Sequence, residues 1–282
     1  NDEVDFKKLG EQLTNRNFDL NDVQEAIINV MGRPVLEIRD DSFDVNEPEL
    51  DFWKDILKKN KKGLTKVIPS IGRIELAGHP SLDWVGTGWL YQDDYIITNR
   101  HVAQEFATRL GERFVFKRNF LNEAYSCSID FKEELNNPTS KSYVIGKVLH
   151  IEPESGYDMA ILQIVWDDNN AKFPSLELAN KLITDETIAT IGYPARDSRT
   201  KIPEDQIRIF SDVFDKKRLA VGEIDYVDPD KQFFIHDCTT LGVPPSWTSK
   251  HKRYTDCTLQ EGNVKETLPY PLSSLIGYSR IL

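Results

Sequence analysis

Cysteine is scarce in this chain of 282 residues, which contains three: Cys127, Cys238 and Cys257. An odd number of cysteines cannot pair completely, and the spacings match no zinc-binding pattern. The sequence therefore predicts neither a disulfide framework nor a metal site. This cysteine usage favours a reducing compartment.

Long apolar runs are also missing. No stretch reaches the roughly eighteen consecutive apolar residues that a transmembrane helix needs. The sequence begins at Asn1, and the charged residues that follow contain no apolar signal-peptide core. We expect a cytoplasmic rather than a secreted protein with no membrane partner, and removal of a signal segment before Asn1 is the open alternative.

Positive charge is in short supply, since the formal net charge is −11 and the pI is about 5.0. Nucleic-acid binding by counterion release needs clustered Lys and Arg, so we expect no nucleic-acid partner. The basic runs Lys58–Lys62 and Lys216–Arg218 are short and indicate solvated faces. Gly86 and Gly88 form no phosphate loop, because no helix with the required motif follows them. A nuclease is therefore disfavoured, and no cofactor is expected.

The first 68 residues have a helical pattern. Apolar residues recur at helical spacing up to Met31, and Asn21-Asp22 supplies a polar cap before a helix over 23–30. A second helix is predicted over Glu47–Lys59, ended by Lys61-Lys62-Gly63. We interpret residues 1–68 as a helical N-terminal extension that packs on the main domain, with a separate adaptor module as the alternative.

From Val67 the pattern changes to short strands separated by Gly, Pro, Asn and Asp, which is typical of an all-β barrel or sandwich. The predicted strands are Ile71–Leu76, Val85–Tyr91, Tyr95–Thr98, Phe114–Phe116, Cys127–Phe131, Tyr143–His150, Ala160–Val165, Thr187–Ile191, Ile207–Phe210, Gly222–Val227 and Phe233–His236. Residues 243–282 are rich in Pro, Ser, Thr and Lys, and no strands are predicted there.

Two segments carry candidate chemistry. The apolar strand that ends at Thr98 runs into Asn99-Arg100-His101, soon after the small-residue run Gly86–Leu90. A strand end followed by a short helical turn holds a basic side chain rigidly, as proton transfer requires. Further along, Tyr157-Asp158 places a carboxylate at the start of another apolar strand.

These motifs resemble those of trypsin-like (chymotrypsin-fold) serine peptidases, in which histidine, aspartate and serine follow in this chain order. The resemblance continues at Ile191–Pro194 and at His236–Gly242, and it covers about residues 68–242. It is stronger to bacterial members than to secreted digestive ones, because Val102 stands where the digestive enzymes have a cysteine.

The resemblance implies roles for three residues. His101 would be the general base, Asp158 would hold its imidazole, and Thr239 would lie near the primary specificity pocket. The other four histidines lack this sequence context: His79, His150, His236 and His251. Asp93 and Asp94 lie too near a predicted hairpin turn to compete with Asp158.

The family's nucleophile is absent from its place. After Leu241-Gly242 the family continues Gly-Asn-Ser-Gly-Ser-Pro, but here its serine position falls on Pro245. Ser246 is one place late, and Pro244-Pro245 forbid the tight turn whose amides would bind an oxyanion. Ser246 is therefore a poor candidate nucleophile.

A change of reading frame explains the altered tail. If each codon starts at the third base of the preceding one, residues 243–248 can encode Gly-Ser-Pro-Val-Leu-Asp, and the final Asp is forced by Trp247-Thr248. Residues 256–261 can encode Gly-Leu-His-Phe-Ala-Gly, and 267–271 can encode Asn-Phe-Ala-Val-Pro. All three resemble peptidase segments that follow the serine. We therefore interpret residues 243–282 as a frameshifted tail.

The expected fold is mainly β: a double antiparallel β-barrel of chymotrypsin type over 69–242 with an incomplete second barrel, behind an α-helical N-terminal extension. The expected function is that of a serine endopeptidase by descent, inactive as written, with protein or peptide substrates. The alternative is a non-catalytic pseudopeptidase that binds peptides or proteins.

Overall fold

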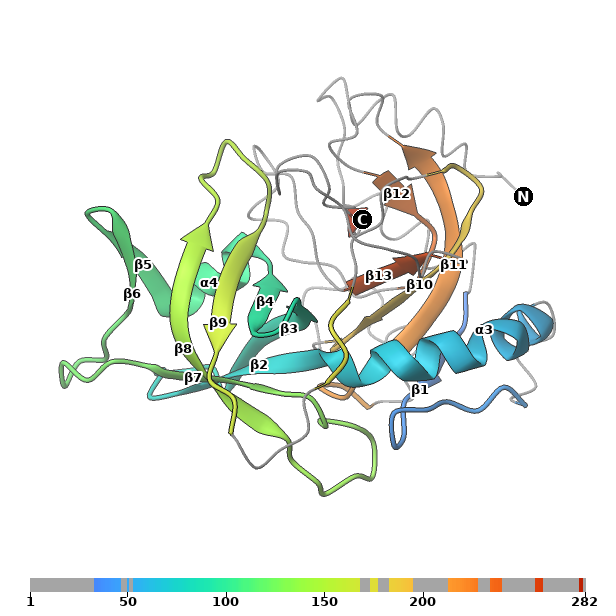
Figure 1. Ribbon diagram of the computed structural model, residues 1–282, viewed down its shortest axis with the longest axis horizontal. Helices are drawn as coiled ribbons and strands as arrows, with labels where there is room; N and C mark the ends of the chain where they lie inside the picture. The colour runs from blue at the N-terminus through green and yellow to red at the C-terminus, as the bar shows by residue number, and fades with distance from the viewer. Residues whose placement is uncertain are drawn as a thin grey trace.

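Short antiparallel strands dominate the molecule. The computed structural model describes residues 33–46, 50, 53–167, 173–176, 183–194, 213–227, 234–239, 257–260 and 279–280. In these ranges six strands close into a barrel in the order β2-β3-β4-β9-β8-β7, on the left in Figure 1. The barrel strands are β2 (Ile71–Ala77), β3 (Trp84–Tyr91), β4 (Tyr95–Thr98), β7 (Ser126–Asp130), β8 (Ser142–Ile151) and β9 (Ala160–Ile164).

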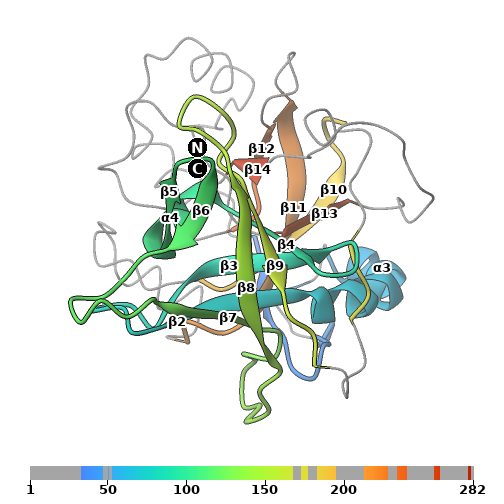
Figure 2. The ribbon, with the colours of Figure 1, turned by 60° about the vertical axis from the view of Figure 1, so that its left-hand side comes forward.

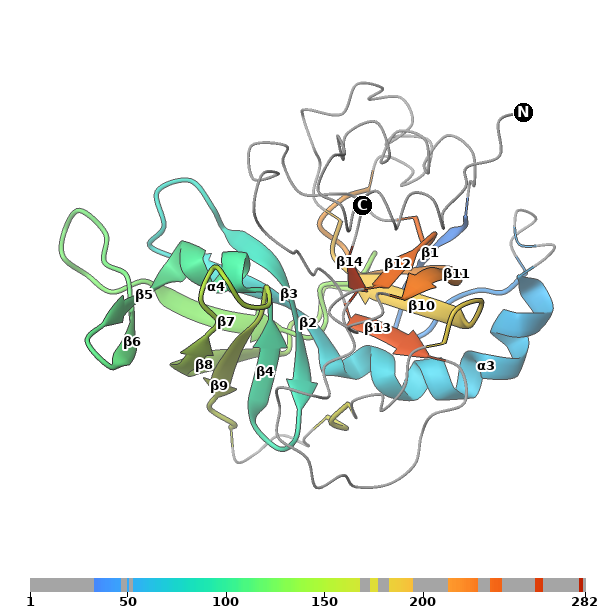
Figure 3. The same ribbon diagram turned by 90° about the horizontal axis from the view of Figure 1, so that it is seen from above.

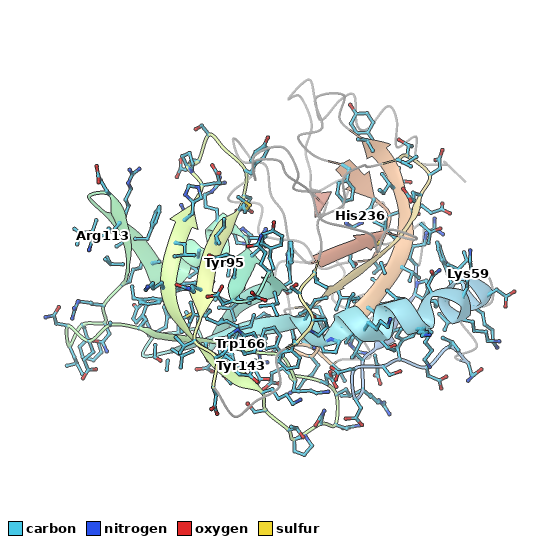
Figure 4. The ribbon with its side chains drawn as sticks, in the orientation of Figure 1. Lys59, Tyr95, Arg113, Tyr143, Trp166 and His236 are labelled. Carbon is cyan, nitrogen blue, oxygen red and sulfur yellow. The ribbon has the colours of Figure 1, made fainter. Side chains whose placement is uncertain are left out.

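The barrel forms because its strands alternate apolar and polar side chains, so that one face of each strand lines a common core. Along β2 the residues Ile74 and Leu76 are buried, and along β9 so are Leu162 and Ile164. β8 and β9 are antiparallel and lie side by side across the front of Figure 2. At one end, Tyr143 and Trp166 meet with ring centroids 4.8 Å apart, near the bottom of Figure 4.

A second sheet lies beside the barrel, on the right in Figure 1. Its strand order is β13-β10-β11-β12-β14, and β1 also pairs with β11. These strands are β1 (Val35–Glu37), β10 (Thr187–Gly192), β11 (Arg218–Val227), β12 (Phe234–His236), β13 (Cys257–Gln260) and β14 (Ser279–Arg280). Within the described ranges this sheet does not close into a barrel.

Two short strands lie in the tail where none was predicted. β13 pairs antiparallel with β10, and β14 pairs parallel with β12. The expectation that residues 243–282 contain no strands is therefore wrong at these positions. β13 and β14 thus pair with sides of β10 and β12 that would otherwise be open strand edges.

The N-terminal extension is a part of the second sheet rather than a purely helical segment. β1 pairs with β11 in the register Val35↔Ala220, and its Leu36 is fully buried. The helix α3 (Lys54–Val67) presents Leu57 to the same apolar cluster, which also contains Leu219. Seen from above, α3 runs from the far side of the second sheet toward the barrel, where β2 follows it (Figure 3). The described part of the extension thus packs on the main domain.

The predicted C-terminal end of the second helix was wrong, and its predicted start at Glu47 lies outside the described residues. The described helix begins at Lys54 and continues through Gly63 to Val67. Gly63 did not end it, because the apolar residues Leu64 and Val67 pack against the second-sheet cluster and hold the following turn in place. Burial of an amphipathic face outweighs the cost of one glycine, which is about 1 kcal/mol. The helix predicted over 23–30 lies outside the described residues.

The remaining described elements are one short α-helix, one hairpin and one 3₁₀ turn. α4 (Arg100–Phe106) is followed by the hairpin β5 (Ala107–Leu110) and β6 (Arg113–Phe116), and η2 (Ile68–Ser70) joins α3 to β2. Of the predicted strands, Ile207–Phe210 lies outside the described residues. Tyr95–Thr98 was found with its predicted ends, and the others were found with shifted ends. β1 and β5 were not predicted. Neither described α-helix is long and apolar enough to cross a membrane.

A buried lysine ties the second sheet to the barrel. Lys217, just before β11, is fully buried, and its Nζ donates to the carbonyl of Phe131 at 2.7 Å and to that of Ile68 at 3.2 Å. The Glu134 carboxylate lies 3.7 Å away. Burial lowers the pKa of Lys217 to about 8, although the charge of Glu134 opposes this shift. Sequence reasoning had placed this lysine on a solvated face, and that interpretation was wrong.

Glycine is required where β3 and β4 meet in the barrel core. A Cβ on Gly88 would lie 2.7 Å from Cγ2 of Ile96 and 3.1 Å from Cδ1 of Ile74. Overpacking of this kind typically costs about 1–3 kcal/mol. Gly88→Ala should therefore lower the free energy of unfolding by that amount in denaturant titrations.

The matched control for Gly88→Ala is Gly63→Ala in α3, where an added Cβ meets nothing within 4 Å. This change should stabilise the protein by about 0.5–1 kcal/mol, because alanine loses less backbone entropy in a helix. Equal effects of the two substitutions would show that the barrel core tolerates the extra methyl group.

Candidate active site

The end of β4 and the start of α4 position His101. Asn99 is extended, with φ −74° and ψ 147°, and its carbonyl accepts a hydrogen bond from Ala103 N at 3.0 Å. The chain therefore turns from strand to helix within one residue. Val102 and Phe106 are buried against the barrel, which fixes the orientation of the helix. His101 directly precedes Val102 and keeps 23% of its side chain exposed.

The carboxylate of Asp158 holds His101 at two points. Nδ1 of the imidazole lies 2.7 Å from Oδ2, and the backbone N–H of His101 donates to Oδ1 at 3.0 Å. The second contact satisfies a first-turn N–H of α4, for which the Asn99 side chain supplies no cap. Only 1% of the Asp158 side chain is exposed. The geometry leaves Nε2 as the ring nitrogen available to a third group.

The charged form of Asp158 is favoured in spite of its burial. Burial alone would raise its pKa, but the hydrogen bond and charge of the His101 ring, the His101 backbone N–H and the charge of Arg100 together lower it below the ordinary value. A buried carboxylate that stays ionised can fix the Nδ1–H tautomer of the imidazole. The pair is thus arranged to accept a proton at Nε2.

Arg100 is a site residue that sequence reasoning passed over. Only 3% of it is exposed, and its guanidinium donates to the carbonyls of Pro153 and Tyr157, both at 2.9 Å. Its Nε lies 4.0 Å from Oδ1 of Asp158. Arg100 therefore ties α4 to the loop that delivers Asp158. The available signal was a charged residue between an apolar strand and an apolar helix face.

Hydrogen bonds at Thr87 connect the site to the second sheet. The Thr98 hydroxyl donates to the Thr87 carbonyl at 2.7 Å, and the Thr87 hydroxyl accepts from Tyr193 N at 3.2 Å. Tyr193 follows β10 and is buried, and burial, reinforced by nearby carboxylates, raises the pKa of its phenol well above the ordinary value. The strand that leads into His101 is thereby linked to the second half of the molecule.

The structure brings His101 and Asp158 together and places Thr239 on the second sheet. Thr239 follows β12, is buried, and donates through its hydroxyl to the Arg33 carbonyl at 2.8 Å. Pro245 and Ser246 lie outside the described residues. The expected role of Thr239 near a specificity pocket therefore stays a prediction.

One cluster of carboxylates within the described ranges has a spacing that could suit a metal ion. The acidic oxygens of Glu75, Asp130 and Glu133 lie within 4.8 Å of one another. Arg73 bridges Glu75 at 2.6 Å and Glu133 at 3.2 Å, and Lys216 also pairs with Glu133. Side-chain cations thus supply the positive charge here, so the cluster does not require a metal.

The lowered pKa of Asp158 predicts a pH-dependent stability. Because its folded-state pKa lies below the unfolded value, the carboxylate stabilises the fold above pH 4 or so, and this contribution is lost as the pH falls through the folded pKa. Asp158→Asn should lower the free energy of unfolding by about 1–3 kcal/mol at pH 7. Denaturant titrations from pH 7 to pH 3 should show the difference shrinking toward acid pH. A constant difference would contradict the account.

The approach of β3 to α4 requires glycine at position 86. A Cβ there would lie 2.6 Å from Cγ2 of Val102, the neighbour of His101. Gly86→Ala should therefore destabilise the protein by about 1–3 kcal/mol. In the Val102→Ala background the same change should cost much less, because the clashing methyl group is gone. A double-mutant cycle measures this coupling, and additive effects would contradict the stated contact.

The chain is similar to known proteins, and one family model covers more than half of it. The chain is 24% identical over 247 residues to a "probable serine protease" from Lysobacter enzymogenes, a match that covers 78% of this chain and 63% of the relative. The solved structure titled "Crystal structure of Deg5" matches 73% of this chain and 81% of its own with 17% identity and a TM-score of 0.42. The family model described as a trypsin-like peptidase domain matches residues 86–262, which include both His101 and Asp158. This chain belongs to the trypsin-like peptidase domain family.

Proposed function

We propose that this chain is a serine endopeptidase by descent that, as written, does not hydrolyse peptide bonds. The observation that carries the proposal is the 2.7 Å contact between His101 Nδ1 and Asp158 Oδ2, in a chain with proline where the family has its serine. A base and its orienting acid are present, and the hydroxyl that they would activate is missing.

In the family's reaction, a serine hydroxyl attacks the carbonyl carbon of a peptide, and its proton passes to the histidine. Here His101 would take that proton at Nε2, while Asp158 would stabilise the imidazolium through Nδ1–H. The proton would then pass to the leaving amine, and water would hydrolyse the acyl-enzyme. Without the hydroxyl no acyl-enzyme forms, so any residual hydrolysis is very small, because these groups act as a unit.

The alternative function is a pseudopeptidase that binds peptides and recruits partners through its N-terminal extension. Two observations disfavour it. A pseudopeptidase kept for binding should differ from the family by a substitution at the serine, with the sequence around it preserved. Here Pro244-Pro245 and the residues that follow instead match the family only in a shifted reading frame. The described part of the extension buries Leu36 and Leu57 against the second sheet instead of presenting an adaptor surface.

We further propose that the protein works in a reducing compartment such as the cytoplasm. The support comes from Cys127 and Cys238, which are both buried free thiols. Burial raises the pKa of each thiol well above its ordinary value, so neither is reactive as a thiolate. Unpaired thiols of this kind suit a compartment in which disulfides do not accumulate.

The missing nucleophile predicts the outcome of active-site labelling. A fluorophosphonate probe should label nothing in this chain, and casein should stay intact. Restoring Gly-Asn-Ser-Gly-Ser-Pro after Gly242, together with the family-like frame, should restore labelling at the new serine and cleavage of casein. His101→Ala in the restored chain should then reduce turnover by about 10⁴-fold or more, since the base acts as one unit with the serine.

Two results would contradict this proposal. One is labelling of the chain as written at Ser246. The other is a genomic sequence with an unbroken frame in which homologous loci also encode Val-Pro-Pro-Ser-Trp. A restored chain that binds peptides but does not cleave them would favour the pseudopeptidase instead.

A further inference from the structure

Arg33, near the start of the described extension, contacts the segment His236–Thr239 that leads toward the missing nucleophile. Its Nε donates to Oδ2 of Asp237 at 2.7 Å, and its terminal nitrogen binds the same oxygen. We propose that Arg33 is a positioning residue, through which the N-terminal extension holds this segment in the place that substrate binding requires.

Asp237 connects Arg33 to the second sheet. Its side chain is fully buried, and while Oδ2 binds Arg33, Oδ1 accepts the backbone N–H of Glu223 in β11 at 2.7 Å. The backbone N–H of Asp237 in turn donates to the Glu223 carbonyl at 3.2 Å. One carboxylate therefore joins the extension, a central strand and the segment after β12. Figure 4 labels His236, which begins this segment, among the strands of the second sheet.

The backbone of Arg33 makes an independent contact with the same segment. Its carbonyl accepts the hydroxyl of Thr239 at 2.8 Å. Arg33 therefore binds the segment at two residues, Asp237 through its guanidinium and Thr239 through its main chain.

Close packing leaves the segment little freedom on the side of β11. A Cβ on Gly222 would lie 2.3 Å from Oδ1 of Asp237 and 2.7 Å from the backbone nitrogen of Cys238. The segment thus rests directly on the β11 backbone at a position where only glycine fits. Moving Asp237 away from β11 would therefore break its hydrogen bond with the backbone N–H of Glu223.

The guanidinium of Arg33 is itself held in place. Its Cζ lies 4.8 Å from the centroid of the Trp53 ring, and Trp53 is buried at the start of α3. Two residues after Arg33, β1 begins to pair with β11. Aromatic stacking and strand pairing reduce the entropy that Arg33 loses when it binds Asp237.

The local charges explain why a cation is needed here. Asp237 lies near two further carboxylates, those of Glu223 and Asp225. Burial raises the pKa of Asp225 to about 8, and the charge of Asp237 adds to this shift while Arg33 opposes it. Among the described residues, Arg33 is the cation that pairs with Asp237. Removing Arg33 would leave a buried carboxylate uncompensated, which is the costly way to break such a pair.

Hydrogen exchange of the full chain tests the proposal without any need for catalysis. The reporting amides are those of Glu223, Asp237 and Cys238, which are hydrogen-bonded in or against this segment. In Arg33→Met these amides should exchange about 100-fold faster, as expected when a buried charge loses its partner. Exchange in the barrel strands β2, β3 and β4 should change by less than about twofold.

Three variants separate positioning from general destabilisation. Arg33→Lys should recover part of the protection, because it keeps the charge but not the planar fork. Arg33→Met combined with Asp237→Asn should recover most of it, since the isosteric amide keeps the Oδ1 acceptor for Glu223 and removes the buried charge. The matched control is Arg39→Met, which removes an exposed arginine from the same extension and should leave all three amides unchanged.

Two outcomes would overturn the proposal. One is uniform acceleration of exchange in both sheets, and the other is unchanged exchange at the three amides in Arg33→Met. If Arg33→Met does not fold, the proposal requires the double variant with Asp237→Asn to fold, and failure of that variant also overturns it.

The inference depends on the proposed function only for the role of Thr239 near substrate. In the chain with its serine restored, Arg33→Met should raise KM for a peptide substrate by about tenfold and change kcat by less than about threefold. A restored chain that never cleaves would refute the proposed function while the exchange result stood. An active restored chain with an unaltered KM would refute the positioning role alone.

Discussion

The buried carboxylate of Asp158 is the contact on which the candidate site depends. It binds the ring of His101 at 2.7 Å and the backbone N–H of the same residue at 3.0 Å, so it sets both the direction of the imidazole and the start of α4. A carboxylate that is 1% exposed stays ionised only with such partners. Arg100, from the same helix, donates hydrogen bonds to the loop before Asp158. These bonds hold α4 in place relative to β9, which follows Asp158.

The second half of the molecule is held to the first by a few buried polar contacts. Thr87 in β3 bonds the residue after β10, and Lys217, just before β11, donates to the carbonyls of Ile68 and Phe131. The extension contributes β1 and part of the apolar cluster under the second sheet. The trypsin-like domain thereby gains an additional strand and helix, which cover apolar surface of the second sheet.

Local patterns predicted most barrel strands and the helix that carries His101, because alternation and turn residues are properties of neighbouring positions. They missed β1 and β5, which are short and have no alternation of their own. The beginning of β11 was also missed, since Arg218–Val221 are buried on both faces and show no polar alternation. His101 and Asp158 were found through the chain order of a known family. Arg33 and Arg100 were missed, because their partners are distant in the sequence or are backbone carbonyls, and no local spacing encodes such contacts.

The central claim is that Asp158 holds His101 with Nδ1 protonated and Nε2 free to accept a proton. Nitrogen–proton correlation spectroscopy of the histidine rings near neutral pH measures this directly. The account predicts a His101 proton on Nδ1 with a strongly downfield shift that is absent from Asp158→Ala. A His101 ring with its proton on Nε2 and a bare Nδ1, unaffected by the loss of Asp158, would contradict it.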